Sequence, residues 1–274
     1  MPAAVTLRRL YVDEQLTIAE TAARLGCSPS TIGRRLRAWT IPVRARGPNT
    51  GRRRLREASG ACRWSADTAW IVGLMASDGN LSKVGYAMSL TSNDVDLLES
   101  VRGILGLDNR LGRVRGGWGH ACYRLQWRDR VFHTWLTDIG LTPRKSLTLG
   151  PLAVPDEYFA DFFRGCIDGD GTILVYKDRQ HTARNARYVY QRLYVSLVSA
   201  SRPFVTWVQG TIERLIGVRG AIYDKSGRGA RPMWTLRYAK RKSLRLLPWM
   251  YASPDKPCLS RKRTRAEQFM PGPE

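Results

Sequence analysis

The sequence predicts an α+β fold in which an αββαββα unit occurs twice, after a small all-α domain. One observation is a repeated motif, an apolar helical run that ends in Asp-Gly at 78–79 and again at 170–171. Another is that similar strand and helix patterns follow both copies, and a third is a pair of capped helices early in the chain. The predicted divisions are an all-α domain at 1–42, a basic linker at 43–63, repeat 1 at 64–150 and repeat 2 at 151–274.

The repeated motif reads Gly-Leu-Met-Ala-Ser-Asp-Gly in the first copy and Gly-Cys-Ile-Asp-Gly-Asp-Gly in the second. Apolar residues at helical spacing before each aspartate predict a helix with an apolar stripe. Small residues one turn apart, at 73 and 77 and again at 165 and 169, allow two helix backbones to approach closely. Gly79 and Gly171 are suited to the left-handed conformation that ends many helices.

The two aspartates are placed where a carboxylate is unfavourable. Each faces the negative end of its helix dipole, and Asp78 and Asp170 repel each other if the helices pack side by side. A divalent cation removes both penalties, because Mg²⁺ takes carboxylate oxygens, backbone carbonyls and water as ligands. One Asp-Gly alone would be only a helix stop, but two copies predict a metal site made by Asp78, Asp170, Ser77 and Gly169.

These motifs resemble the signature of the LAGLIDADG homing endonucleases, in the form that carries both copies in one chain. Both copies keep the final aspartate, which binds the catalytic metal in that family. Ala76 replaces the signature's earlier aspartate, which is not a metal ligand there. The resemblance covers about residues 64–265. It implies a pseudo-twofold saddle of two antiparallel sheets, a monomer that cuts both strands of a long asymmetric DNA target across the minor groove, short 3′ overhangs, a link to intron mobility, and Mg²⁺ or Mn²⁺ as cofactor.

The resemblance also implies a pair of catalytic lysines. Family members place a lysine after the last helix of each copy, near the reacting phosphate and water. The segments Leu-Thr-Pro-Arg-Lys-Ser and Leu-Ser-Arg-Lys-Arg resemble that region and point to Lys145 and Lys262. These lysines join Asp78 and Asp170 in the predicted catalytic set, with ordinary phosphate contact as the alternative role.

Composition limits the partners. The net charge of +22 and the isoelectric point near 10.6 indicate that the protein binds a polyanionic partner. No apolar run approaches the roughly 18 residues of a membrane-spanning helix, so no membrane partner is expected. No nucleotide cofactor is expected either, because the Gly-rich phosphate loop is missing. Five scattered cysteines and no visible secretion signal predict a reduced intracellular protein, cytoplasmic or nucleoid-associated, without structural zinc.

The first 42 residues look like a helix-turn-helix. Thr17 and Glu20 form a capping-box pattern, and Ser28 followed by Pro29 starts a second helix. Ile32, Leu36 and Trp39 are predicted to fill the inner face of that helix. A second helix of this kind enters the DNA major groove, although a helical hairpin with a solvated basic face is the alternative. The predicted DNA contacts on the outer face are Ser30, Thr31, Arg34, Arg35 and Arg37.

The linker is rich in arginine, proline and glycine, which is typical of an unstructured connection. It would lie along DNA phosphates and add affinity without sequence information, or else act only as a solvated tether. Arg52 and Arg53 are the predicted contacts.

Repeat 2 resembles repeat 1 beyond the motif. The segment from Tyr86 is matched with the segment from Tyr194, and 122–127 with 233–238. The later copy holds extra residues, mostly around 176–192 and 224–231, which lengthen its hairpin loops. Alternation along the strands puts Arg, Gln, Tyr and Ser on one face, where they can meet base edges. A solvated antiparallel face is the alternative. The predicted DNA contacts here are Lys83, Arg113, Arg115, Arg124, Gln126, Arg128, Lys177, Arg179, Arg187, Tyr188, Tyr190, Arg192, Tyr194, Lys225, Arg228, Arg231 and Arg237.

The sequence thus predicts a site-specific, Mg²⁺-dependent double-strand DNA endonuclease. Two other functions use the same saddle: a DNA-binding regulator without catalysis, and an RNA-splicing maturase that binds its host intron RNA. Intact Asp78 and Asp170 argue against the regulator. Salt-matched affinities for intron RNA and duplex DNA separate the maturase from the nuclease.

Overall fold

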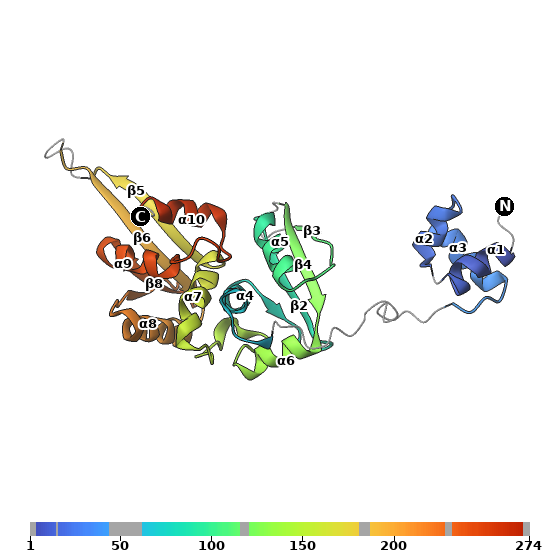
Figure 1. Cartoon of the computed structure of the whole chain (residues 1–274), viewed down its shortest axis with the longest axis horizontal. Coiled ribbons are helices and arrows are strands. Elements are labelled where there is room, and N and C mark those ends of the chain that lie inside the picture. Colours follow the sequence, from blue (N-terminus) through green and yellow to red (C-terminus); the bar gives the residue numbers. More distant parts are fainter. Residues whose placement is uncertain are drawn as a thin grey trace. The chain divides into compact units, whose positions relative to one another are not determined.

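The computed structural model describes residues 4–14, 16–43, 62–115, 121–180, 187–227 and 232–270. The chain divides into two compact units, Met1–Arg56 and Glu57–Glu274, which are described separately (Figure 1). Most of the predicted linker lies outside the described residues. No helix among those described is long and apolar enough to cross a bilayer.

The N-terminal unit is a small helical domain with its own core. Its elements are α1 (Ala4–Arg8), a π-helical turn η1 (Arg9–Asp13), α2 (Ile18–Arg24) and α3 (Pro29–Ala38). The capping box of Thr17 and Glu20 is present, and the Ser28 hydroxyl accepts a hydrogen bond from Thr31 N, as predicted. Ile32 and Leu36 are fully buried. Trp39 is 38% exposed instead of filling the inner face, and its ring lies beside the Arg35 guanidinium.

The C-terminal unit contains the two predicted αββαββα repeats and one additional helix. Repeat 1 consists of α4 (Ala66–Ser77), β1 (Asn80–Leu81), β2 (Ala87–Ser92), α5 (Val95–Ile104), β3 (Gly112–Arg115), β4 (Ala121–Arg128), α6 (Arg130–Asp138) and the 3₁₀ turn η3 (Lys145–Leu147). Repeat 2 consists of the 3₁₀ turn η4 (Asp156–Tyr158), α7 (Phe159–Asp168), β5 (Gly171–Asp178), β6 (Tyr190–Ser199), α8 (Arg202–Ile216), β7 (Ala221–Asp224), β8 (Trp234–Ala239), α9 (Lys240–Met250) and the additional α10 (Ser260–Glu267).

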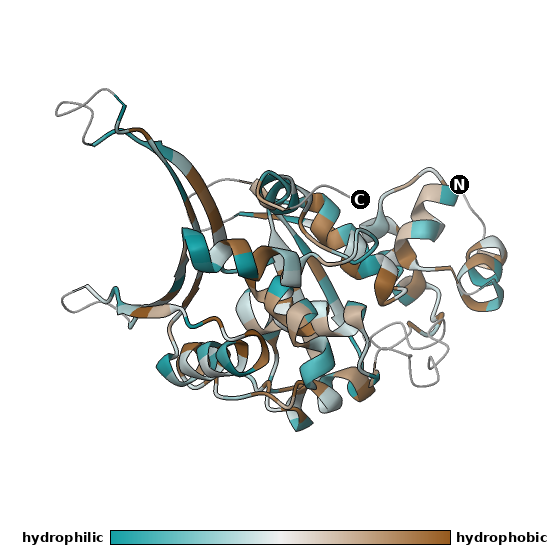
Figure 2. Cartoon of the chain, turned by 60° about the vertical axis from the view of Figure 1, so that its left-hand side comes forward, coloured by the Kyte–Doolittle hydropathy of each residue, from teal (hydrophilic) through white to brown (hydrophobic). Residues whose placement is uncertain are grey.

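Each repeat contributes one antiparallel sheet, with order β1-β2-β4-β3 in sheet A and β5-β6-β8-β7 in sheet B. Met88 pairs with Trp127, and Val195 pairs with Tyr238, so Met88 and Val195 are equivalent. The sequence match of Tyr86 with Tyr194 is therefore wrong by one residue, an error that exchanges the two faces of a strand. The strands of sheet B curve, and the helices of repeat 2 lie on one side of them (Figure 2).

The motif helices α4 and α7 lie side by side between the two sheets (Figure 1). Gly73 and Gly165 permit this contact, because a Cβ on Gly73 would collide with the Phe162 carbonyl and one on Gly165 with the Trp70 carbonyl. The expected apolar stripe is wider than predicted, since every residue of α4 from 68 to 76 is buried. A helix enclosed on all sides needs apolar residues on all sides.

The glycines after the aspartates have a role other than the one predicted. The positive-φ glycines of the described chain do not include Gly79 or Gly171. A Cβ on Gly79 would meet Met75, and one on Gly171 would meet Ile167, each in the preceding helical turn. The chain therefore needs glycine there for space where it leaves the helix.

Candidate catalytic centre

The two motif aspartates converge where α4 and α7 end. Asp78 is the C-terminal cap of α4, and Asp170 follows Gly169, the cap of α7. Asp78 Oδ2 lies 3.2 Å from the position that a Cβ on Gly169 would occupy, so the first aspartate reaches across to the end of the second helix. Both aspartates are classed as exposed residues, although their carboxyl groups are partly desolvated.

The electrostatics of this pair are unfavourable in the absence of a cation. Partial desolvation and then the charge of Asp170 raise the pKa of Asp78 to about 6. Desolvation also raises the pKa of Asp170. Carboxylates that repel each other and face the negative ends of two helices provide a place where positive charge is stabilised.

The structure brings both predicted lysines to this place. Lys145 Nζ donates to the carbonyls of Ser77 and Gly79, at 3.3 and 2.6 Å. Lys262 Nζ donates to the equivalent carbonyls of repeat 2, Gly169 and Gly171, at 3.3 and 2.8 Å. It also donates to those of Ile167 and Asp168. Each ammonium therefore caps the carbonyl end of a motif helix, where positive charge opposes the helix dipole.

Both lysines are almost completely buried, with 7% of Lys145 and 4% of Lys262 exposed. Burial lowers the pKa of Lys145 and lowers that of Lys262 to about 8. Each lysine lowers the pKa of the aspartate in the other repeat more than the other lysine does. Lys262 is the stronger of the two in lowering the pKa of Asp78, and Lys145 in lowering that of Asp170. Each half of the centre thus combines the aspartate of one motif with the capped helix end of the other.

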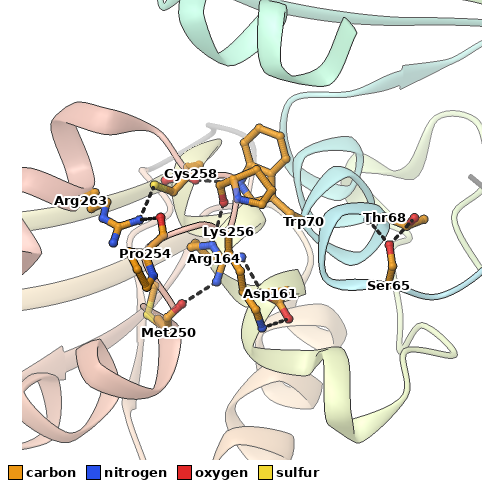
Figure 3. A network of polar contacts seen from close by, with 12 residues as sticks. Ser65, Thr68, Trp70, Asp161, Arg164, Met250, Pro254, Lys256, Cys258 and Arg263 are labelled. Atoms are coloured by element: carbon orange, nitrogen blue, oxygen red, sulfur yellow. Dashed lines mark hydrogen bonds and ion pairs between the residues drawn. The ribbon is translucent and has the colours of Figure 1, made fainter. Parts of the chain in front are cut away.

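A buried ionic network supports the repeat 2 half of the centre (Figure 3). Arg164 on α7 is 1% exposed and donates to the carbonyls of Met250 and Pro257 and to Asp161 Oδ1. Lys256 pairs with the other oxygen of Asp161 at 3.2 Å. This network fixes the segment between α9 and α10 against α7, and so fixes the start of the helix that carries Lys262.

Asp168 links the same segment to repeat 1. Its Oδ2 accepts hydrogen bonds from Trp70 Nε1 at 2.8 Å and from Leu259 N at 2.9 Å. Burial raises the pKa of Asp168, and its Oδ1 is buried without a hydrogen-bond partner among the described residues. Sequence reasoning missed this contact, because Ala76 occupies the equivalent place in repeat 1 and gives no pattern to compare.

A polar hollow of about 450 Å³ lies beside Asp78. Its walls include the β2–α5 turn, Gly169, Asp168 and Arg261 of α10. Arg261 forms a bidentate ion pair with Asp94, through Nε–Oδ1 at 3.0 Å and Nη2–Oδ2 at 2.9 Å. The tail of repeat 2 is therefore bound to repeat 1 next to the aspartates. The pair was not predicted, because Arg261 and Asp94 lie far apart in the sequence.

The outer face of sheet A carries three of the predicted DNA contacts. Arg124, Gln126 and Arg128 are exposed and alternate with buried Leu125 and Trp127 on β4. Arg113 and Arg115 do not join this face, because they pair with Tyr123 and Ala121, which share the face of Leu125. Paired residues of adjacent strands point to the same side of a sheet.

The outer face of sheet B is aromatic as well as basic. Tyr176 stacks on Tyr194, and the Arg237 guanidinium lies over the rings of Tyr194 and Tyr223. Arg192 lies over Tyr190 and pairs with Asp178. Lys177 lies four residues after Ile173 on β5, so both side chains point to the same face of the strand. That face is opposite to the outer face.

The remaining predicted contacts are dispersed. Lys83, Arg179, Arg187, Tyr188 and Lys225 flank hairpin turns. Arg52, Arg53, Arg228 and Arg231 lie outside the described residues. In the N-terminal unit, Arg34 and Arg37 are exposed, Arg35 is half-buried, and the hydroxyls of Ser30 and Thr31 hydrogen-bond that of Ser28.

The donor set suits a hard divalent cation. The described residues contain no cluster of three or more His, Cys, Asp or Glu side chains, so a protein-only cage of such side chains is not formed there. Two carboxylates with nearby carbonyls fit Mg²⁺, which keeps several waters and uses few protein ligands. The carbonyls of Ser77 and Gly169 also accept hydrogen bonds from Lys145 and Lys262, both at 3.3 Å.

The fold matches those of known nucleases. The meganuclease I-SmaMI, bound to uncleavable DNA, has a TM-score of 0.52 at 11% identity, covering 76% of this chain and 88% of that one. I-DmoI, in complex with DNA and Ca, has a TM-score of 0.50 at 14% identity, covering 73% of this chain and 96% of that one. No family model matches the sequence, and no curated protein is significantly similar to it. The two sheets and paired helices thus form the saddle expected from the LAGLIDADG resemblance, a likeness of fold.

Proposed function

We propose that this protein is a site-specific double-strand DNA endonuclease whose single catalytic centre contains Asp78 and Asp170. The observation that carries the proposal is the convergence of two exposed aspartates on the ends of two packed helices. A strongly basic chain and two sheets with basic outer faces supply the affinity for DNA. The fold neighbours, which were solved on DNA, support the same partner.

In this proposal Asp78 and Asp170 hold divalent cations, Mg²⁺ by preference and Mn²⁺ as a substitute, together with the carbonyls of Ser77 and Gly169. A bound cation supplies charge for the phosphate and an acidified water for attack. The chain's own contribution is to hold two carboxylates at one point and to keep each of them near a lysine. The crossed arrangement gives each half of the centre one aspartate and one lysine, which suits one cut per strand.

Lys145 and Lys262 are proposed as the residues that stabilise this arrangement and offset negative charge near the reacting phosphates. Their bonds to backbone carbonyls favour this role over free phosphate contact. The N-terminal unit is proposed to extend the target through α3, with the arginine-rich linker along the phosphates. We further propose a monomer that acts inside the cell, leaves short 3′ overhangs and takes part in intron mobility.

The test is a selection of cleaved molecules from a library of randomised duplexes, with Mg²⁺ and then with EDTA. The proposal expects a single preferred target that is cut in both strands only with the metal. The Asp156→Asn variant is the matched control for Asp78→Asn and Asp170→Asn, because it makes the same change of carboxylate to amide in an exposed ion pair with Arg214. Specific binding by a folded protein without cutting would support a regulator instead. Tighter salt-matched binding to intron RNA than to duplex DNA would support a maturase.

A further inference from the structure

Arg237 occupies an unusual position on sheet B. It lies on β8, between β6 and β7, and its partners in the sheet are Ser196 and Ala221. Its guanidinium lies 5.4 Å from the ring centre of Tyr194 on β6 and 5.6 Å from that of Tyr223 on β7. Two aromatic rings from neighbouring strands therefore hold one guanidinium on the outer face of the sheet.

This arginine has no acid partner among the described residues. Its Nε is buried and makes no hydrogen bond there. The other arginines on the outer faces that make contacts are bound differently, since Arg192 pairs with Asp178 and Arg124 Nε donates to Thr91 Oγ1. Contacts with the two rings limit the rotamers of Arg237 and leave its hydrogen-bond donors uncommitted.

We infer that Arg237 is a specificity-determining residue that reads a guanine in the major groove of the DNA target. An arginine fork matches the O6 and N7 acceptors of guanine, and this pair is the commonest specific contact between protein and DNA. A guanidinium that is already ordered loses little conformational entropy on binding, so more of the contact contributes to discrimination. This inference rests on the proposed function.

The alternative is a phosphate contact, which uses the same charge but reads no sequence. The two roles respond differently to substitution. Loss of a phosphate contact weakens binding to all sequences about equally, whereas loss of a base contact relaxes the preference at one position.

The experiment measures binding of the selected target and of every single base-pair substitution of it. We expect the wild-type protein to prefer G·C at one position by about tenfold or more. Arg237→Lys keeps the charge but lacks the fork, and should reduce that preference to about twofold while leaving the other positions unchanged. Tyr223→Leu, on an edge strand, should weaken the same preference by a smaller factor.

Arg245→Lys serves as the control, because Arg245 lies on α9 and donates to the carbonyls of Ile216 and Gly217. The inference is overturned if Arg237→Lys keeps the wild-type profile, or if it weakens all targets equally. Failure of the wild-type protein to select any target would instead count against the proposed function, so the two failures are distinguishable.

Discussion

The two repeats share a strand order but hold their halves of the candidate catalytic centre in different ways. In repeat 1 the motif helix is apolar from 68 to 76 apart from Thr68, and Lys145 reaches two carbonyls. In repeat 2 the motif helix buries Asp161, Arg164 and Asp168, and Lys262 reaches four carbonyls.

The difference shows that a duplicated fold can keep its geometry while its supporting interactions diverge. The backbone crossing needs small residues in both copies, so Gly73 and Gly165 correspond. The polar network of repeat 2 binds the segment before α10, which joins Lys262 to α7 and Arg261 to repeat 1. The buried part of the repeat 1 motif helix contains no charged side chain, and its one polar contact with α7 that is described above is the hydrogen bond from Trp70 to Asp168.

The largest expected effect is at Arg164. The Arg164→Met change leaves the carbonyls of Met250 and Pro257 without their buried donor and Asp161 without its closest cation. Breaking a buried ion pair in this way costs about 3–5 kcal/mol of unfolding free energy. The equivalent position in repeat 1 is Val72, where Val72→Ala removes two methyl groups at a cost of about 2 kcal/mol. Urea denaturation of both variants tests the comparison, and an unchanged midpoint for Arg164→Met would contradict it.

The second largest expected effect is a difference in stability between the variants of the two lysines. Lys262→Met removes donors to four carbonyls at a helix end, and we expect a loss of about 2 kcal/mol. Lys145→Met removes donors to two, and about half that loss is expected. Thermal unfolding under the same conditions measures both. An equal or larger loss for Lys145→Met would show that the supporting interactions are symmetric after all.

The register of sheet A allows a sharper test of which face of repeat 1 binds DNA. Arg124 and Arg113 lie on neighbouring strands but on opposite faces. Arg124→Ala should weaken binding of the selected duplex by about 1–2 kcal/mol, as expected for a lost groove contact. Arg113→Ala removes the same charge and should cost about 0.5 kcal/mol of binding free energy or less at physiological salt. Equal losses in a titration of labelled DNA would mean that total charge, not the face, determines affinity.

The smallest effect concerns pH. The pKa of Asp78 is about 6 in the folded chain and 3.8 for a free aspartate, so the folded state binds its proton more tightly. Stability of the metal-free protein therefore falls as pH rises from about 4 to 6 and stays lower above that. Because the side chain is exposed, Asp78→Asn should gain only about 1 kcal/mol at pH 8, or 2–4 °C in Tm, and nothing below pH 4. Calorimetry in EDTA at several pH values checks this, and a loss at pH 8 would contradict it.

The sequence predicted the elements that repeat and missed the contacts that do not. The motif helices and the small residues that allow their close approach followed from spacing, because helical periodicity and small residues leave a local pattern. The convergence of Asp78 and Asp170 was expected from the family resemblance. The contacts of Asp168 with Trp70 and of Arg261 with Asp94 join residues far apart in the chain, so spacing carries no trace of them.

Other errors have a local cause. The one-residue shift between Tyr86 and Tyr194 arose because short strands with similar residues on both faces align almost equally well in either register. The sequence did not show that Arg113 and Arg115 lie on the face of Leu125, because β3 is an edge strand and an arginine beyond the core is exposed on either face. The role of Gly79 was misjudged because a helix end and a crowded helix turn both select glycine.

Strand-resolved cleavage of the selected duplex by the Asp78→Asn and Asp170→Asn variants, with Mg²⁺ and with DNA binding measured in parallel, tests the central claim most directly. If the two aspartates form one centre that cuts both strands, each variant binds like the wild type and loses double-strand cutting by about a thousandfold or more. Cutting of both strands at the wild-type rate by either variant would contradict the account.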